Sequence, residues 1–437
     1  MSRPRHRVPA VIGLLGMSCA FLSLSAADAD SELALRQAEL ARLAEKAARF
    51  AESRRPLPID DEDVIPRRSM RYLDDRLVID PLAMISLGYD SNPRRAENNP
   101  EGDPFVVGLI GIAGEYHLST ADRLQGQATL LVRRYQSVDE RDLTGGEGFF
   151  GWRHVGQALT GGVSVRGELG DEPQTSIDDA VERSVVGGEA NLGWRGATDR
   201  ISTGLSIEQV DWREAGSNYD AQERDHLGGA VRVRAERRLG IGVMISGTVL
   251  VGANTYREGS RFNDSTLSAL HVGGAVPTGL RSGVYGEAGV RMARYTDPFA
   301  GDPTYDDQVV VRPSGLLGWS WRPDIATGVL IESRSWLEDG TTANAVWTWT
   351  TRVQGKLRLR VDSFWFTELV HTTYTDSGAA TGNPTGKRTV DEIRTWIDWT
   401  FTRGLKAEAR VVYAQTDSVL GNDYSRLRTM LSLTAAW

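Results

Sequence analysis

The segment LTGGVSVRGEL, residues 159–169, alternates apolar with polar or small side chains at nearly every second position. This period of two is that of a β-strand, whose successive side chains point to opposite faces. The polar face carries Arg166 and Glu168 as well as hydroxyl side chains. The segment therefore predicts a strand with one apolar face and one charged face.

Segments of 10 to 15 residues with the same alternation follow one another from Arg76 to Trp437. A β-sandwich would build its core from the apolar faces, yet here those faces are interrupted by many Gly and Ala residues. Lipid outside and a hydrated interior explain both faces, so we expect an outer-membrane barrel. The residues expected to line its lumen are Arg232, Arg234, Glu236, Glu287, Arg291, Glu332, Arg334, Arg352, Lys356, Arg358, Arg360, Glu392, Arg394, Glu408 and Arg410.

The connections between these segments are of two alternating kinds. Tight turns such as Arg403–Gly404 alternate with long, acidic loops such as Asp376–Arg388, and eight of the first kind with nine of the second imply 18 strands. A β-propeller with blades of about 40 residues is the main rival, but each blade would need four short strands. We predict an all-β fold, a transmembrane antiparallel outer-membrane β-barrel of about 18 strands over residues 76–437.

The amino-terminal residues have the pattern of a signal peptide. Three arginines precede an apolar run from Val8 to Ala26, and small residues follow it. The alternative is a short membrane anchor, for which this run is marginal in length. We expect a cleaved signal peptide over residues 1–29 and export to the cell outer membrane of a Gram-negative bacterium.

Residues 30–75 are expected to form a short N-terminal periplasmic helix and a linker. Residues 31–55 contain no Gly or Pro and place leucines along one stripe, which indicates an amphipathic helix. That helix either docks alone on the barrel or a partner, or pairs with a second copy to give a homo-oligomer. The linker runs from Ile59 to Asp75.

The last segment alternates in phase to the final residue, Trp437. It resembles the carboxy-terminal signature by which the outer-membrane assembly machinery recognises barrels. Trp437 is therefore the expected assembly signal, and outer-membrane lipid and that machinery are the expected partners.

Composition excludes several classes of function. The formal net charge of −8 argues against binding nucleic acid, which needs a basic patch. The single cysteine, Cys19, lies in the expected signal peptide, and the six histidines are scattered. We therefore expect no metal site, no cofactor and no catalytic residues. Asp225 with His226, and Ser268 with His271, are the only combinations an enzyme could use.

The sequence Gly88-Tyr89-Asp90-Ser91-Asn92-Pro93 ends the first predicted strand. It resembles the opening of the putative β-barrel porins, type 2, many of which are encoded in exopolysaccharide biosynthesis and export loci. The resemblance implies a channel or accessory barrel for a secreted glycan, with periplasmic export components as partners. A capped turn would also explain the motif, since Asp and Asn bind their own backbone in turns.

The polar phase of residues 345–360 forms a basic ladder. Guanidinium groups bind carboxylates and phosphates in bidentate fashion, so an acidic glycan would find partners there. Carboxylates such as Glu392 and Asp398 could instead neutralise the ladder. Tyr285, Trp336 and Trp396 could stack on sugar rings or pack against Arg.

The alternatives to glycan export are a general or solute-selective diffusion porin and a closed structural or surface-binding barrel. The sequence leaves open the solute, the direction of transport, whether the lumen is open or plugged, and the oligomeric state.

Overall fold

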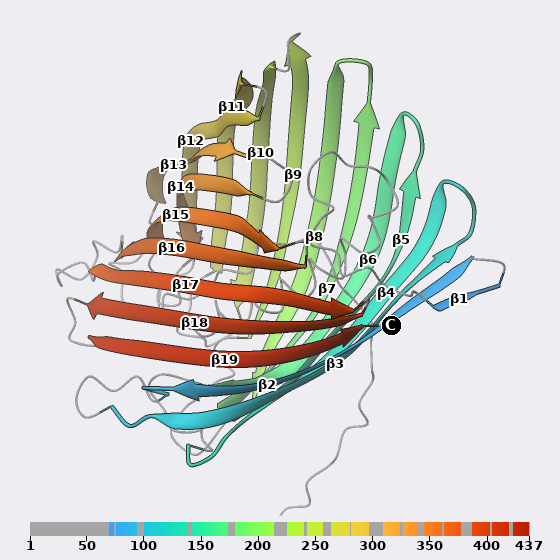
Figure 1. The fold of residues 1–437 in the computed structure, drawn as a ribbon. Helices are drawn as coiled ribbons and strands as arrows, with labels where there is room; N and C mark the ends of the chain where they lie inside the picture. The colour runs from blue at the N-terminus through green and yellow to red at the C-terminus, as the bar shows by residue number, and fades with distance from the viewer. Residues whose placement is uncertain are drawn as a thin grey trace, which may run out of the picture.

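Alternation of side chains produces one continuous antiparallel sheet in the computed structural model (Figure 1). The structure describes residues 70–73, 76–93, 100–138, 142–173, 180–213, 225–239, 243–256, 264–279, 281–296, 309–323, 327–339, 345–360, 362–376, 387–402, 404–418 and 423–436. The strands are β1 (Met70–Tyr72), β2 (Leu77–Asp90), β3 (Asp103–His117), β4 (Asp122–Tyr135), β5 (Leu143–Val155), β6 (Leu159–Pro173), β7 (Ala180–Arg195), β8 (Asp199–Arg213), β9 (His226–Leu239), β10 (Val243–Tyr256), β11 (Asp264–Gly279), β12 (Ser282–Thr296), β13 (Val309–Trp321), β14 (Gly328–Asp339), β15 (Ala345–Arg360), β16 (Ser363–Asp376), β17 (Lys387–Thr402), β18 (Leu405–Ser418) and β19 (Tyr424–Ala436).

Strands β2 to β19 close into a barrel. Each strand pairs antiparallel with the next one along the chain, and β19 pairs with β2 from Arg428↔Asp90 to Ala436↔Leu82. The predicted all-β antiparallel barrel of 18 strands is therefore confirmed. No helix among the described residues is long and apolar enough to cross a membrane. The expected signal peptide, the helix at 31–55 and Trp437 lie outside the described residues.

The two kinds of connection lie at opposite ends of the barrel, because every strand is antiparallel to its neighbours. The tight turns are closed by backbone hydrogen bonds, such as the one from the Gly156 nitrogen to the Leu159 oxygen at 2.8 Å. At the turn between β17 and β18, Gly404 has a φ of 93°, which glycine adopts without the steric cost of a Cβ. We call these the tight-turn end and the loop end.

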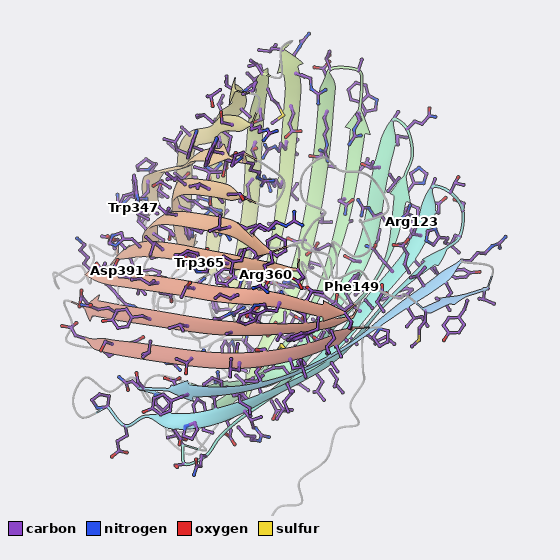
Figure 2. All side chains as sticks on the ribbon, viewed as in Figure 1. Arg123, Phe149, Trp347, Arg360, Trp365 and Asp391 are labelled. Atoms are coloured by element: carbon purple, nitrogen blue, oxygen red, sulfur yellow. The ribbon has the colours of Figure 1, made fainter. Side chains whose placement is uncertain are left out.

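The wall has two distinct faces, and side chains project from both (Figure 2). Large exposed apolar side chains, such as Ile110, Leu270 and Leu369, share one phase of their strands, which we call the outer face. On the other phase, side chains from strands two or three apart meet, as Arg234 of β9 and Glu287 of β12 do at 4.0 Å. Side chains converge in this way only on the concave side, so this phase is the inner face.

Part of the expected linker belongs to the sheet. Strand β1 pairs with the start of β2, with Met70 opposite Ile79 and Tyr72 opposite Leu77. The chain reverses between them at Leu73, whose φ is 54°. Three residues are too few for their alternation to stand out in a sequence, so the linker prediction, which began the sheet only at β2, missed this strand.

Candidate functional site

The inner face is not polar throughout. On β3 to β5 it carries a buried apolar cluster whose members include Phe105, Val107, Leu109, Leu131 and Leu143. The outer face of β3 is also apolar, with Val106 and Ile110 exposed. The prediction of one polar face per strand is therefore wrong for this part of the wall.

The chain following β4 covers this apolar cluster from inside the barrel. Val138 is a buried member of the cluster. Its backbone nitrogen and that of Ser137 donate to Asp103 Oδ2 at 3.0 and 2.8 Å. The Asp103 carboxylate on β3 therefore holds the start of the β4–β5 connection against the inner face at the loop end.

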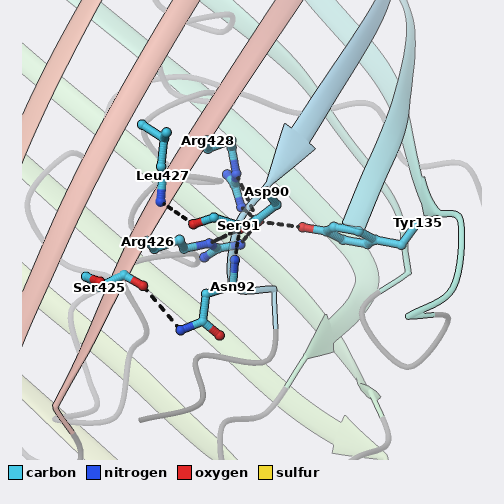
Figure 3. Close-up of polar contacts among 8 residues, drawn as sticks. All are labelled: Asp90, Ser91, Asn92, Tyr135, Ser425, Arg426, Leu427 and Arg428. Atoms are coloured by element: carbon cyan, nitrogen blue, oxygen red, sulfur yellow. Dashed lines mark hydrogen bonds and ion pairs between the residues drawn. The ribbon is translucent and has the colours of Figure 1, made fainter. Parts of the chain in front are cut away.

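A buried carboxylate ties the first barrel strand to the last (Figure 3). Asp90 is 0% exposed and accepts hydrogen bonds from Arg426 Nε at 2.8 and 2.9 Å. It also accepts from Arg428 Nη2 at 3.3 Å and from the Tyr135 hydroxyl at 3.0 Å. Four side chains from β2, β4 and β19 therefore converge where the barrel closes.

The residues after Asp90 extend this closure. The Asn92 nitrogen donates to Asp90 Oδ1 at 3.1 Å, as in an Asx turn, and the Asn92 side chain donates to the Ser425 oxygen at 3.2 Å. Ser91 exchanges hydrogen bonds with the backbone of Leu427. The Gly-Tyr-Asp-Ser-Asn motif thus makes the predicted turn and also joins β2 to β19. The second role could not be predicted, because Arg426 lies more than 300 residues away.

Fourteen of the fifteen predicted lumen residues lie on the inner face by register. The exception is Arg360, because a shift in register after Arg358 pairs it with Ser363, which shares the outer phase of β16 with Leu369. Four of them, together with Glu368, form a continuous chain of ion pairs on β14 to β17. Arg352 lies between Glu332 at 3.6 Å and Glu368 at 3.7 Å. Arg394 lies 3.1 Å from the same Glu368 and also binds Glu392. Glu368 links the two arginines but was absent from the predicted set, although its phase in the strand could have revealed it.

The other predicted residues make separate contacts. Arg410 binds Glu408, and Lys406 binds Asp398. Arg234 donates to Glu236 at 2.8 Å, while the Arg334 guanidinium lies 4.5 Å from the Trp336 ring centre. Much of this wall is therefore an ion-pair network, which was one of the two interpretations that the sequence left open.

The residues of the basic ladder nearest the tight-turn end have different neighbours from those of Arg352. The Lys356 ammonium lies 4.7 and 5.4 Å from the ring centres of Phe364 and Phe366, and Arg358 lies 5.9 Å from that of Phe364. Arg358 and Arg360 are exposed and lie next to the tight turn between β15 and β16. Cations at the tight-turn end therefore face aromatic rings, whereas Arg352 faces carboxylates.

The predicted aromatic residues pack against neighbouring side chains. Trp396 is buried and stacks on Phe366 with ring centres 5.0 Å apart, and Arg410 lies over its ring at 5.6 Å. The Tyr285 hydroxyl donates to Glu332 at 3.0 Å. These contacts match the alternative in which the aromatic side chains pack against charged groups.

The histidines considered for an enzyme have other neighbours in the structure. His271 Nε2 lies 2.6 Å from the Ser314 hydroxyl on the inner face, while Ser268 is on the opposite phase of β11. Asp225 accepts a hydrogen bond from the Trp212 nitrogen at 2.6 Å, and the His226 ring packs beside Tyr256. Within the described residues, no group of three or more His, Cys, Asp or Glu could hold a metal ion.

Comparison with known proteins finds similarity at the level of the fold. No family model and no curated protein matches the sequence. Similar solved structures include the outer membrane protein OpdK from Pseudomonas aeruginosa, with 10% identity, 84% of this chain and 100% of that chain covered, and a TM-score of 0.46. A BenF-like porin from Pseudomonas fluorescens Pf-5 shows 10% identity over 82% and 98% of the two chains, with a TM-score of 0.46. The copper transporter OprC shows 9% identity over 85% and 82%, with a TM-score of 0.49.

These similarities concern the fold alone. The class rests on the wall itself: 18 antiparallel strands in a closed ring, with an apolar outer face, are the architecture of porin-type outer-membrane barrels.

Proposed function

We propose that this chain is an outer-membrane channel that passes hydrophilic solutes and favours anions. The apolar outer face supports insertion into lipid. Barrels of 16 to 18 strands are wide enough to leave an aqueous channel, and the inner face from β14 to β18 is charged. These features support the channel alternative over a purely structural barrel.

The preference for anions rests on one observation, the inner face of β15. From Arg352 to Arg358 it carries three cationic side chains and no acidic one. Arg352 is balanced by two glutamates, whereas Lys356 and Arg358 lie over aromatic rings. An anion that enters at the tight-turn end would therefore meet Lys356 and Arg358 on the inner face of β15.

The narrower form of the proposal is export of an acidic glycan. It is supported by the resemblance of the Gly88–Pro93 motif to the type 2 porins and by the affinity of guanidinium groups for carboxylates. A diffusion porin for small acidic solutes would use the same ladder. The packing of Trp396 against Phe366 argues against sugar stacking at that position.

Ion selectivity in planar bilayers tests the channel. Lys356→Glu with Arg358→Glu should shift the reversal potential in a salt gradient toward cations. The matched control is Arg134→Glu with Arg237→Glu, which changes the same charge on the exposed outer phase of β4 and β9. An unchanged reversal potential in the inner-face variant, with channels present, contradicts the proposal. Glycan secretion at the normal level in a deletion strain removes the narrower form alone.

A further inference from the structure

The barrel wall contains a seam between β13 and β14 at its loop end. The ladder between these strands runs only from Trp321↔Val329 to Gly315↔Ser335. Both strands continue beyond it, since β13 pairs with β12 as far as Val309 and β14 pairs with β15 as far as Asp339. The two strands are thus both present at the seam but are not paired with each other.

Proline explains why the ladder stops. Continuing the register by one residue per step places Pro313 opposite Leu337. Pro313 has no backbone N–H, so it cannot donate to the Leu337 oxygen. Side chains take over instead: Trp347 Nε1 donates to the Pro313 oxygen at 3.1 Å, and Arg291 Nη1 donates to the Leu337 oxygen at 2.8 Å. Both carbonyls left by the ladder are therefore capped from neighbouring strands.

The loop end of β14 packs against β12 at the seam. Leu337 belongs to the outer phase of β14, and Ala293 belongs to the inner phase of β12. Both are 0% exposed and form one cluster, against which Leu267, Val310 and Trp347 pack. The outer face of the β14 end therefore rests on the inner face of β12, and apolar side-chain contacts close the wall here in place of a backbone ladder.

The seam borders lipid on one side and cations on the other. Val309 and Val311, on the outer phase of β13, are exposed and belong to the apolar outer face. On the inner phase, Arg291 and Arg312 are direct cross-strand partners. Two neighbouring guanidinium groups offer several charge-assisted hydrogen-bond donors to an anionic group.

We propose that this seam is a lateral opening that binds and passes an amphiphile with one anionic head group and a single alkyl chain. The head group binds at Arg291 and Arg312, and the chain lies among Leu267, Ala293 and Leu337 as it moves between the lumen and the lipid. Opening breaks no backbone ladder; it requires the apolar contacts of Leu337 and the hydrogen bond from Arg291 to the Leu337 oxygen to give way. This inference does not depend on the solute that the lumen passes.

A reversible disulfide across the seam, which we call the seam lock, tests the proposal. Ala293→Cys with Leu337→Cys joins two side chains that pack together, and the only native cysteine is Cys19, in the expected signal peptide. The control lock is Ser86→Cys with Ser432→Cys, on a regular ladder where the two hydroxyls are 2.8 Å apart. Dithiothreitol opens each lock in the same preparation.

The probe is a dodecyl sulfate with a diazirine at the end of its chain, used on the protein in phosphatidylcholine nanodiscs. We expect labelling at 290–294 and 309–313 to exceed that by the same chain with a trimethylammonium head by about tenfold. The oxidised seam lock should remove this excess, dithiothreitol should restore it, and the control lock should leave it unchanged. Labelling that ignores the seam lock, or that is equal for both head groups, overturns the proposal.

A second variant covers failure of the cysteine pair to insert. Pro313→Val supplies the missing N–H, so the ladder can extend and the excess labelling should fall; undiminished labelling overturns the proposal. Potassium chloride conductance of the same preparations separates this proposal from the channel. A protein that forms no channel but shows lock-dependent labelling contradicts the proposed function and supports the seam.

Discussion

Asp90 illustrates how a local motif can serve a distant contact. As a turn residue, Asp90 needs only the hydrogen bond that its Oδ1 accepts from the Asn92 nitrogen. In the barrel it also holds Arg426 and Arg428, whose side chains are 4% and 9% exposed. Removing one partner of a buried ion pair leaves an uncompensated charge, which is far more costly than losing a neutral hydrogen bond.

Asp90→Asn should therefore lower the stability of the folded barrel by about 3–5 kcal/mol, because two buried guanidinium groups lose their anion. The measurement is the temperature at which the protein changes its migration in a heat-modifiability gel. Ser86→Ala on the same pair of strands removes one hydroxyl–hydroxyl bond and should cost about 0.5–1.5 kcal/mol. Equal shifts for the two variants would show that Asp90 acts only as a turn residue.

At the scale of the strand, alternation was sufficient for most of the wall. It predicted the strands and their two faces because each strand needs one phase for lipid and another for the interior, and the count of tight turns and long loops predicted the strand number. It failed on β3, where Val106 is exposed outside and Val107 is buried inside. The inner apolar patch is tolerated because Val138, contributed by a later connection, covers it. Likewise Pro313 could be seen in the sequence, but not its position opposite Leu337.

The phase of a regular strand can be tested with adjacent residues of β16. Leu369→Arg places a charge on the outer face and should destabilise the inserted barrel by about 2–4 kcal/mol if it lies near the bilayer midplane. Val370→Arg, one residue further, places the same charge on the inner face opposite Glu392 and should be tolerated. Urea titration of the folded fraction in lipid vesicles compares the two. A greater loss in the inner variant would invert the assigned faces.

Asp103 accepts hydrogen bonds from two backbone nitrogens at the start of the connection after β4, so we expect this carboxylate to control the width of the loop end. Asp103→Ala removes the acceptor for two backbone nitrogens, each bond to a charged group being worth about 1.5–3 kcal/mol. The single-channel conductance in planar bilayers should then rise. Asp103→Asn keeps a neutral acceptor and should give a smaller increase. Identical conductance in Asp103→Ala and the unmodified protein would show that this connection does not restrict the channel.

At the scale of the whole molecule, closing the barrel requires pairing between two strands from opposite ends of the chain. The ring is complete only when β19, the last strand, pairs with β2, the first barrel strand. Recognition of Trp437 by the assembly machinery remains a prediction, whereas the structure places the Asp90 ion pairs at the junction. Recognition of Trp437 would act before insertion, whereas the Asp90 ion pairs act after the barrel has closed. Substitutions at the two residues should therefore have different effects.

Deleting Trp437 should lower the amount of protein in the outer-membrane fraction, while the molecules that do insert keep the heat stability of the full chain. Asp90→Asn should do the reverse. Near-normal amounts reach the membrane, but the protein unfolds at a lower temperature because Arg426 and Arg428 lose the Asp90 carboxylate. Quantitative immunoblots of membrane fractions, read with and without heating, give both values for each variant. Trp437→Phe is the control for the first, since it keeps an aromatic terminus. Normal levels of the truncated chain would remove the role of Trp437, and a joint loss of amount and stability in both variants would show that recognition and closure are one step.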